Sequence, residues 1–160
     1  MKRSCKVCWG LSALLVIAVA AMAYLFVIRG AVTASDDGRT TITLSTGERD
    51  FVLAEMRVFL EGVQEITKGL AAKDMKAVVT VAKKFRPGND GGMPISLMGK
   101  LPSEFRALAQ TTHKGFEALT TEAQDMGDQS VVLTKLSEIM LNCTACHATY
   151  RFDVDADKRK

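Results

Sequence analysis

The sequence predicts an all-α protein, an antiparallel four-helix bundle preceded by a single N-terminal transmembrane helix. A long apolar segment without charge stands near the start, and four later segments repeat apolar residues every three or four positions. No period-2 alternation is evident after residue 46, and 160 residues leave room for one such domain. The predicted boundaries are 1–30 for the membrane segment, 31–46 for a linker, 47–152 for the bundle and 153–160 for a charged tail.

The first segment, Val7–Ile28, has 22 residues and no charge. As a helix it would be roughly 33 Å long, enough to cross a hydrocarbon core of about 30 Å. Lys2, Arg3 and Lys6 precede it, and basic residues favour the cytoplasmic side. We therefore expect an anchor with a cytoplasmic N-terminus, which in a bacterium places the rest of the chain on the periplasmic face of the inner membrane.

A cleaved signal peptide is the alternative, which would give a soluble periplasmic protein. Ala21–Ala23 has the A-x-A form of a cleavage site. The apolar run continues through Tyr24–Ile28, however, so a cleaved chain would begin with exposed hydrophobic residues. Cys5 and Cys8 form a C-x-x-C without a following His, and we interpret them as incidental thiols at the reducing cytoplasmic edge.

Four helices are expected after the linker, which is rich in Thr, Ser, Asp and Gly. Ser45 and Glu48 form a capping-box pattern that predicts a helix to about Ala72. Asp74 can cap a shorter second helix, which Pro87 ends. The last two helices follow Pro102 and Asp128, and Gly127 separates them. Two short connections and one longer one favour an antiparallel bundle. The inward residues expected on the fourth helix are Val132, Leu136, Ile139, Met140 and Cys143.

Charge and motif content exclude several classes of function. Four of the 21 Lys and Arg residues precede Ala31, which leaves 17 against 18 acidic residues in the exported part. This balance gives no sign of a nucleic-acid surface. No paired carboxylates, nucleophile–base arrangement or phosphate loop supports a hydrolase or transferase, so we expect no enzyme.

The segment Cys143-Thr144-Ala145-Cys146-His147 is the C-x-x-C-H attachment signature of c-type haem. On a helix the three side chains project from neighbouring points of one face, so two thiols can reach the porphyrin vinyl groups while the imidazole reaches the iron. A bare C-x-x-C could also be a redox disulfide or half of a zinc site. Zinc would need two more ligands, and the only other histidine is His113. We predict one covalent haem c, with His147 on the iron.

The same segment, continued through Tyr150 and Arg151, resembles the C-x-x-C-H-x-x-Y/F-R ending of the cytochrome c′ family (class II c-type cytochromes) and its low-spin, methionine-ligated relatives. The resemblance covers about residues 46–152 and is loose outside the motif. It implies a four-helix bundle with the haem between helices, often as a homodimer. It also implies that Arg151 lies near the haem edge, where it could pair with a propionate. A solvated cation at a helix C-terminus is the alternative for Arg151.

The residue that would face the iron opposite His147 decides between two functions. In this family the facing residue comes from the first helix, four positions after an arginine. By that count Arg49 leads to Leu53, which would leave a five-coordinate haem that binds nitric oxide or carbon monoxide. Met56 lies one turn further on the same face, and its thioether would give a six-coordinate iron suited to electron transfer. His113 is a third candidate ligand.

The sequence thus predicts a membrane-tethered, periplasmic, monohaem c-type cytochrome that acts in electron transfer. Its expected partners are redox proteins of the periplasm or inner membrane, and residues 7–28 would contact the membrane. The alternative function is a five-coordinate binder of nitric oxide or carbon monoxide. A structural subunit of a larger membrane redox complex is a third hypothesis.

Overall fold

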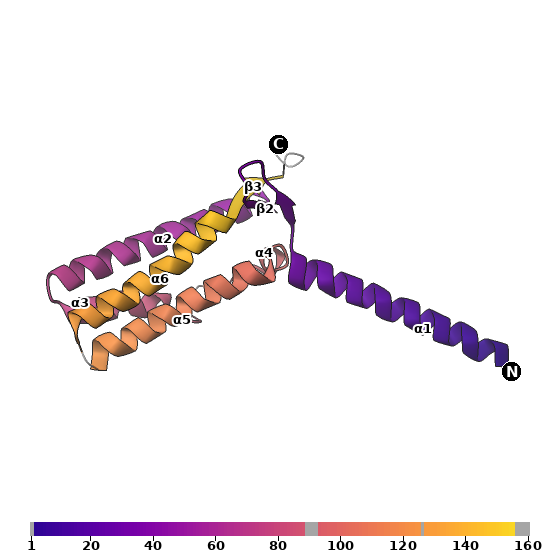
Figure 1. The fold of residues 1–160 in the computed structure, drawn as a ribbon, viewed down its shortest axis with the longest axis horizontal. Coiled ribbons are helices and arrows are strands. Elements are labelled where there is room, and N and C mark those ends of the chain that lie inside the picture. Colours follow the sequence, from indigo (N-terminus) through magenta and orange to yellow (C-terminus); the bar gives the residue numbers. More distant parts are fainter. Residues whose placement is uncertain (1, 89–92, 126, 156–160) are drawn as a thin grey trace.

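The computed structural model describes the backbone of residues 2–88, 93–125 and 127–155, and the side chains from residue 6 onward. The described chain is mostly helical and begins with one apolar helix, as the sequence predicts (Figure 1). Its elements are α1 (Lys2–Ala23), the π-helical turn η1 (Tyr24–Arg29), β1 (Val32–Ala34), β2 (Thr40–Leu44), α2 (Thr46–Ala71), α3 (Met75–Ala82), the 3₁₀ turn η2 (Lys83–Phe85), α4 (Ile95–Met98), α5 (Ser103–Asp125), α6 (Gln129–Thr149) and β3 (Tyr150–Val154).

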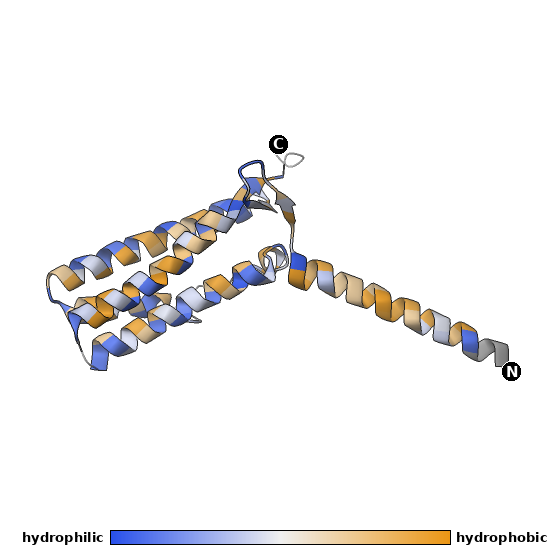
Figure 2. Ribbon diagram, in the orientation of Figure 1, coloured by the Kyte–Doolittle hydropathy of each residue, from blue (hydrophilic) through white to orange (hydrophobic). Residues whose placement is uncertain are grey.

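The helix α1 extends away from the rest of the molecule (Figure 1), and the turn η1 joins it to the domain and contacts α5. The segment Lys6–Arg29 has a mean hydropathy of 2.7 and is long and apolar enough to cross a membrane. Its large apolar side chains are exposed, and most of its ribbon has the colours of hydrophobic residues in Figure 2. A signal sequence has the same length and composition, so both predictions for this segment remain open. Cys8 is an exposed free thiol on α1.

The predicted helix starts are confirmed in atomic detail. The Ser45 backbone N–H donates to the Glu48 carboxylate at 2.8 Å, and the Glu48 N–H donates to the Ser45 hydroxyl at 3.4 Å, which completes the capping box of α2. Asp74 accepts from the Ala77 N–H at 3.0 Å at the start of α3. Asp128 accepts from the first N–H groups of α6. These side chains satisfy donors that a helix start leaves unpaired.

A first buried cluster holds α2, α3, α5 and α6 together, and α2, α5 and α6 lie side by side (Figure 1). Its centre is aromatic: the Phe85 ring lies 4.9 Å from the Phe59 ring and 5.0 Å from the Phe116 ring. Gly62 of α2 faces Phe85 so closely that a Cβ atom there would overlap the ring. The members of this first cluster are Ile66, Leu70, Val78, Val81, Ala82, Phe85, Phe116, Leu119, Ala123, Val132, Leu136 and Ile139.

The prediction of an all-helical chain is wrong in two segments. The predicted linker, residues 31–46, contains β1 and β2, and the predicted tail, residues 153–160, begins within β3; these strands form one three-stranded sheet. The strands β1 and β2 make an antiparallel hairpin, and β3 pairs in parallel with β2. In the register Ile42 lies opposite Val32 on one side and Phe152 on the other. Ile42 and Leu44 are 0% and 1% exposed, so the predicted linker contributes to the core. The all-α class is therefore incomplete, and residues 156–160 of the predicted tail lie outside the described residues.

The sheet and the nearby helix ends share a second buried cluster. Phe105 of α5 packs edge-on against Tyr150 and Phe152 of β3, with ring centres 5.4 and 5.6 Å apart. This cluster closes the end of the domain at which α1 is attached (Figure 1). Its buried members are Ile42, Leu44, Val52, Leu97, Leu101 and Phe105, and Met56, Met93, Cys146, Tyr150 and Phe152 pack against them.

Candidate functional site

A cavity of about 170 Å³ opens where the second cluster meets the surface. It lies between the first half of α2, the start of α5, the end of α6 and the strand β3. Most of the residues singled out from the sequence line it. The lining residues are Arg39, Arg49, Leu53, Met56, Phe105, Cys146, His147, Tyr150, Arg151 and Phe152.

The C-x-x-C-H motif lies in the last two turns of α6, as predicted, since this helix runs to Thr149. Cys146 and His147 line the cavity. Cys143 does not line it: the residue is exposed, and its thiol donates to the Ile139 carbonyl at 3.9 Å. Met140 is also exposed, against the prediction that it faces inward. The motif is therefore preformed as a helix face, while one of its thiols points along the helix.

Both motif cysteines are free thiols. Partial burial of the sulfur raises the pKa of Cys143, although the residue as a whole is exposed, and burial together with the neighbouring Cys143 sulfur raises the pKa of Cys146. The thiols are therefore protonated near neutral pH and present S–H groups. The imidazole of His147 makes no hydrogen bond or ion pair within the described residues, so both ring nitrogens are available to a ligand.

The wall of the cavity on α2 carries both residues that were predicted to face the iron. Leu53 and Met56 are each partly buried and line the cavity. Met56 also packs against the second cluster. The structure thus brings both candidates to the same space as His147, and it does not separate them by position.

The structure places His113, the third candidate ligand, outside this cavity. Its Nδ1 lies 2.9 Å from the Phe85 carbonyl oxygen, and its ring lies 5.3 Å from the Phe59 ring. Both contacts belong to the first cluster, where His113 has a hydrogen-bond partner and an aromatic neighbour. Its placement gives the hypothesis of a His113 ligand no support.

Three arginines surround the cavity mouth, and two of them were not predicted as site residues. Arg39 comes from the predicted linker. Arg49 was used in the sequence only to locate Leu53, four positions later, and was not itself predicted to bind. Arg39 and Arg151 both contact Asp37, at 2.6 and 3.4 Å. The hydrogen bond from Arg39 holds the pKa of the Asp37 carboxyl well below its usual range. The Arg49 guanidinium has no ion pair among the described residues, so the mouth of the cavity is cationic.

Arg39 and Arg151 also join the hairpin to the end of α6. Arg39 donates to the His147 carbonyl at 3.4 Å, and Arg151 donates to the Ser35 hydroxyl at 3.2 Å. The sequence gives no sign that Arg39 contacts the end of α6, because this contact depends on the parallel pairing of β2 with β3. The hairpin therefore fixes the backbone of the C-x-x-C-H segment from outside the helices.

The chemistry of the lining residues fits a haem, whereas the size of the cavity fits it only in part. The reduced thiol of Cys146, a free imidazole, an apolar wall and a cationic mouth match one vinyl group, iron, a macrocycle and two propionates, while the second motif thiol, that of Cys143, lies outside the lining. Pockets for ligands of drug size are about 300–1,000 Å³, so the present cavity must widen to hold a macrocycle. Direct contacts between α2 and α6, which both border the cavity, are sparse compared with those between α5 and α6.

The zinc alternative finds no support in the described residues, where no three His, Cys, Asp or Glu side chains are placed to hold a bare metal ion. Comparisons with protein-family models, with curated proteins and with solved structures found no match to this chain. The function is therefore argued from the site itself.

Proposed function

We propose that this chain is a c-type cytochrome of the cytochrome c′ type, which carries one covalent haem and transfers electrons at the periplasmic face of the inner membrane. One observation carries the proposal. Cys146 and His147 of the C-x-x-C-H motif face a cavity whose wall on α2 carries Met56 and Leu53. The side-by-side packing of α2, α5 and α6 supports the bundle that the family resemblance implies.

The chain's own residues would hold the group as follows. The S–H groups of Cys143 and Cys146 would add across two vinyl groups, each sulfur forming a C–S bond and each proton passing to the neighbouring vinyl carbon. Cys143 would first have to turn from the Ile139 carbonyl towards the cavity. The imidazole of His147 would hold the iron from α6. When bound, haem supplies a one-electron iron couple.

The lining residues outside the motif would orient the group and set its environment. Arg49, Arg151 and Arg39 line the cavity and would pair with the two haem carboxylates, Arg39 and Arg151 in exchange for their contacts with Asp37. Phe105 and Phe152 line the cavity with apolar surface, which would keep water from a bound iron and thereby favour its less charged, reduced form.

The thioether of Met56, which lines the same cavity as His147, is the proposed second protein ligand, and an imidazole–thioether pair would raise the reduction potential and saturate the iron. An optical spectrum of the purified full chain tests this. Six-coordinate low-spin iron gives sharp split bands and does not respond to carbon monoxide. Met56→Ala should lose the low-spin spectrum, and Leu53→Ala, the matched control from the same cavity wall, should keep it. A parent spectrum that is high-spin and shifts with carbon monoxide would remove Met56 from the iron.

A five-coordinate binder of nitric oxide or carbon monoxide is the second candidate function. It is favoured by Leu53, which lines the cavity at the position that the count from Arg49 implies. In that case Leu53→Ala should change the affinity for carbon monoxide while Met56→Ala should not. An alkaline pyridine spectrum without the bands of a thioether-linked haem would overturn both functions.

The helix α1 is the proposed membrane anchor, with a cytoplasmic N-terminus. Its exposed apolar surface supports this proposal, as do the basic residues Lys2, Arg3 and Lys6 at its N-terminal end. N-terminal sequencing of the mature protein tests it: a chain that begins after residue 23 would identify a cleaved signal peptide.

A further inference from the structure

The short helix α4 presents two apolar side chains to solvent. Ile95 is 88% exposed and Met98 is 43% exposed, while Leu97 between them is fully buried in the second cluster. The buried leucine holds α4 in place, so its outer side is a fixed feature of the domain. Single exposed apolar residues are common on protein surfaces, so the significance of this pair depends on where it lies.

The pair lies beside the point at which the apolar helix leaves the domain. The Ala31 N–H donates to the Lys100 carbonyl at 2.8 Å, just after α4. Arg106 of α5 donates to the Val27 carbonyl of the turn η1. Gly30, with φ at +69°, packs so tightly that a Cβ atom would lie 2.9 Å from the Pro102 nitrogen. The junction between α1 and the domain is therefore a packed contact and not a free tether.

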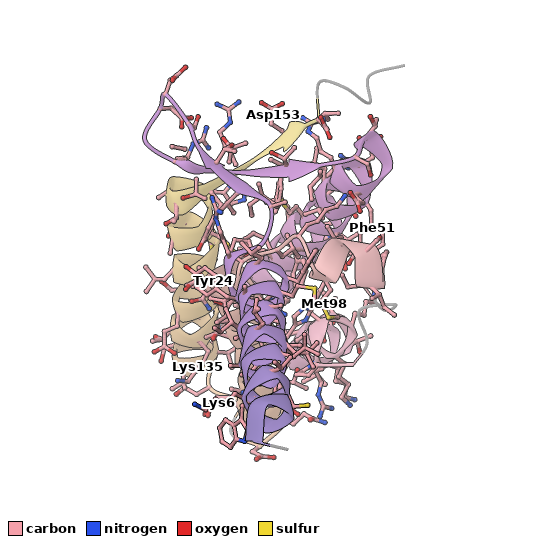
Figure 3. All side chains as sticks on the ribbon, turned by 90° about the vertical axis from the view of Figure 1, so that its right-hand side faces the viewer. Lys6, Tyr24, Phe51, Met98, Lys135 and Asp153 are labelled. Carbon is pink, nitrogen blue, oxygen red and sulfur yellow. The ribbon has the colours of Figure 1, made fainter. Side chains whose placement is uncertain are left out.

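Figures 1 and 3 both show α4 beside the base of α1. In Figure 1, α4 lies next to the base of α1. Figure 3 looks at the face from which α1 leaves, and the labelled Met98 lies on this face beside the α1 ribbon. If α1 crosses a bilayer, this face of the domain is the one directed towards the lipid.

The few residues between the apolar segment and the domain limit the distance between this face and the membrane. Ala31 follows Ile28 by three residues, which span at most about 10 Å. The headgroup layer of a bilayer is roughly 5 to 8 Å thick on each side. Ala31 and the Lys100 carbonyl bonded to it therefore lie within this layer or just outside it. Apolar side chains of interfacial helices enter the boundary between headgroups and acyl chains by roughly 5–10 Å. Ile95 and Met98 are thus within reach of the lipid.

We propose that α4 is a second membrane contact, with Ile95 and Met98 inserted at the boundary between headgroups and acyl chains beside the anchor. The proposal rests on the proposed retention of α1 in the mature protein. Two contacts fix the orientation of the domain against the membrane plane, whereas a single transmembrane helix can still tilt in the bilayer together with the domain packed on it. Because α4 packs on the cluster that borders the cavity, the cavity is then held at a constant height above the bilayer, within reach of partners embedded in the same membrane.

Tryptophan emission in lipid vesicles tests the contact, because Trp9 is the single tryptophan of the chain. The full chain is reconstituted in phosphatidylcholine vesicles whose lipids carry bromine on the upper acyl carbons, and emission is divided by that in unbrominated vesicles. One variant combines Trp9→Phe with Ile95→Trp. Its matched control combines Trp9→Phe with Leu60→Trp, at a site on α2 that is 70% exposed and distant from the junction. The ratio cancels quenching by a bound haem.

The contact predicts loss of emission in brominated vesicles from tryptophan at position 95 and none from tryptophan at position 60. Equal emission with both lipids at position 95 would overturn the contact, and so would equal quenching at both positions, which would indicate non-specific adsorption. Trp9 of the parent chain reports on the anchor separately. If Trp9 itself is not quenched, α1 does not lie in the bilayer, and the failure belongs to the proposed anchor.

Discussion

The substitution Leu44→Ala should destabilise the domain strongly, although the sequence places this residue in a linker. Leu44 is 1% exposed and lies in β2, the middle strand of the sheet. Removing a buried leucine side chain costs about 2–5 kcal/mol, since the cavity left behind adds to the lost burial. A middle strand is hydrogen-bonded on both sides and cannot move far to fill the cavity. We therefore expect a loss of about 3 kcal/mol in the free energy of unfolding.

The matched control is Leu60→Ala on α2, where the same side chain is 70% exposed. Surface substitutions usually change the free energy of unfolding by less than about 0.5 kcal/mol. Both variants and the parent are unfolded by denaturant in detergent micelles and followed by circular dichroism. A common slope against denaturant concentration would show that only stability has changed. If Leu44→Ala and Leu60→Ala differ by less than about 0.5 kcal/mol, the hairpin is not part of the folded core and the argument for it is wrong.

Three further changes test separate parts of the structure. Burial of Glu48 opposes ionisation of its carboxyl, but hydrogen bonds from Lys100 and Ser45 outweigh this effect. The pKa of Glu48 therefore falls from 4.5 to about 2. The contribution of ionised Glu48 to the free energy of unfolding should therefore be present above pH 4.5 and disappear as the pH falls through 2. In denaturant titrations, Glu48→Gln should lower the free energy of unfolding by about 1 kcal/mol at pH 7 and by almost nothing near pH 2. Gly30→Ala should cost about 1–3 kcal/mol, and more than Gly38→Ala, because both glycines have positive φ but only Gly30 faces neighbouring atoms. His113→Gln should leave the optical spectrum of the haem-loaded chain unchanged, and any change in iron coordination would show that His113 reaches the iron.

The helices were predictable because their signals are local. The capping box of Ser45 and Glu48, and the caps at Asp74 and Asp128, each act within one turn, and all are present in the structure. The apolar stripes also depend on spacings of three and four residues, which the helix itself brings together. Such features are written into a short stretch of sequence, so one chain is enough to find them.

The sheet was missed although part of its signal is in the sequence. Tyr150, Phe152 and Val154 alternate with charged residues, which is the period-2 pattern of a strand. In the presumed linker, Ile42 and Leu44 alternate with threonines, which favour strands. The parallel pairing of β2 with β3, in contrast, joins segments more than 100 residues apart. Nothing local specifies that pairing, and Arg39 becomes a site residue only through it.

The choice between Leu53 and Met56 depends on where the macrocycle would sit along α2. The two residues share a helix face, but they differ by about 4.5 Å along the helix axis. Thioether bonds to Cys143 and Cys146 would fix the ring to α6, so its height on α2 follows from the register between these two helices. Both side chains now line a cavity that must widen, and Cys143 must turn towards it. The spectra of Met56→Ala and Leu53→Ala would therefore report more than a ligand: they would show which turn of α2 faces His147 across a bound haem.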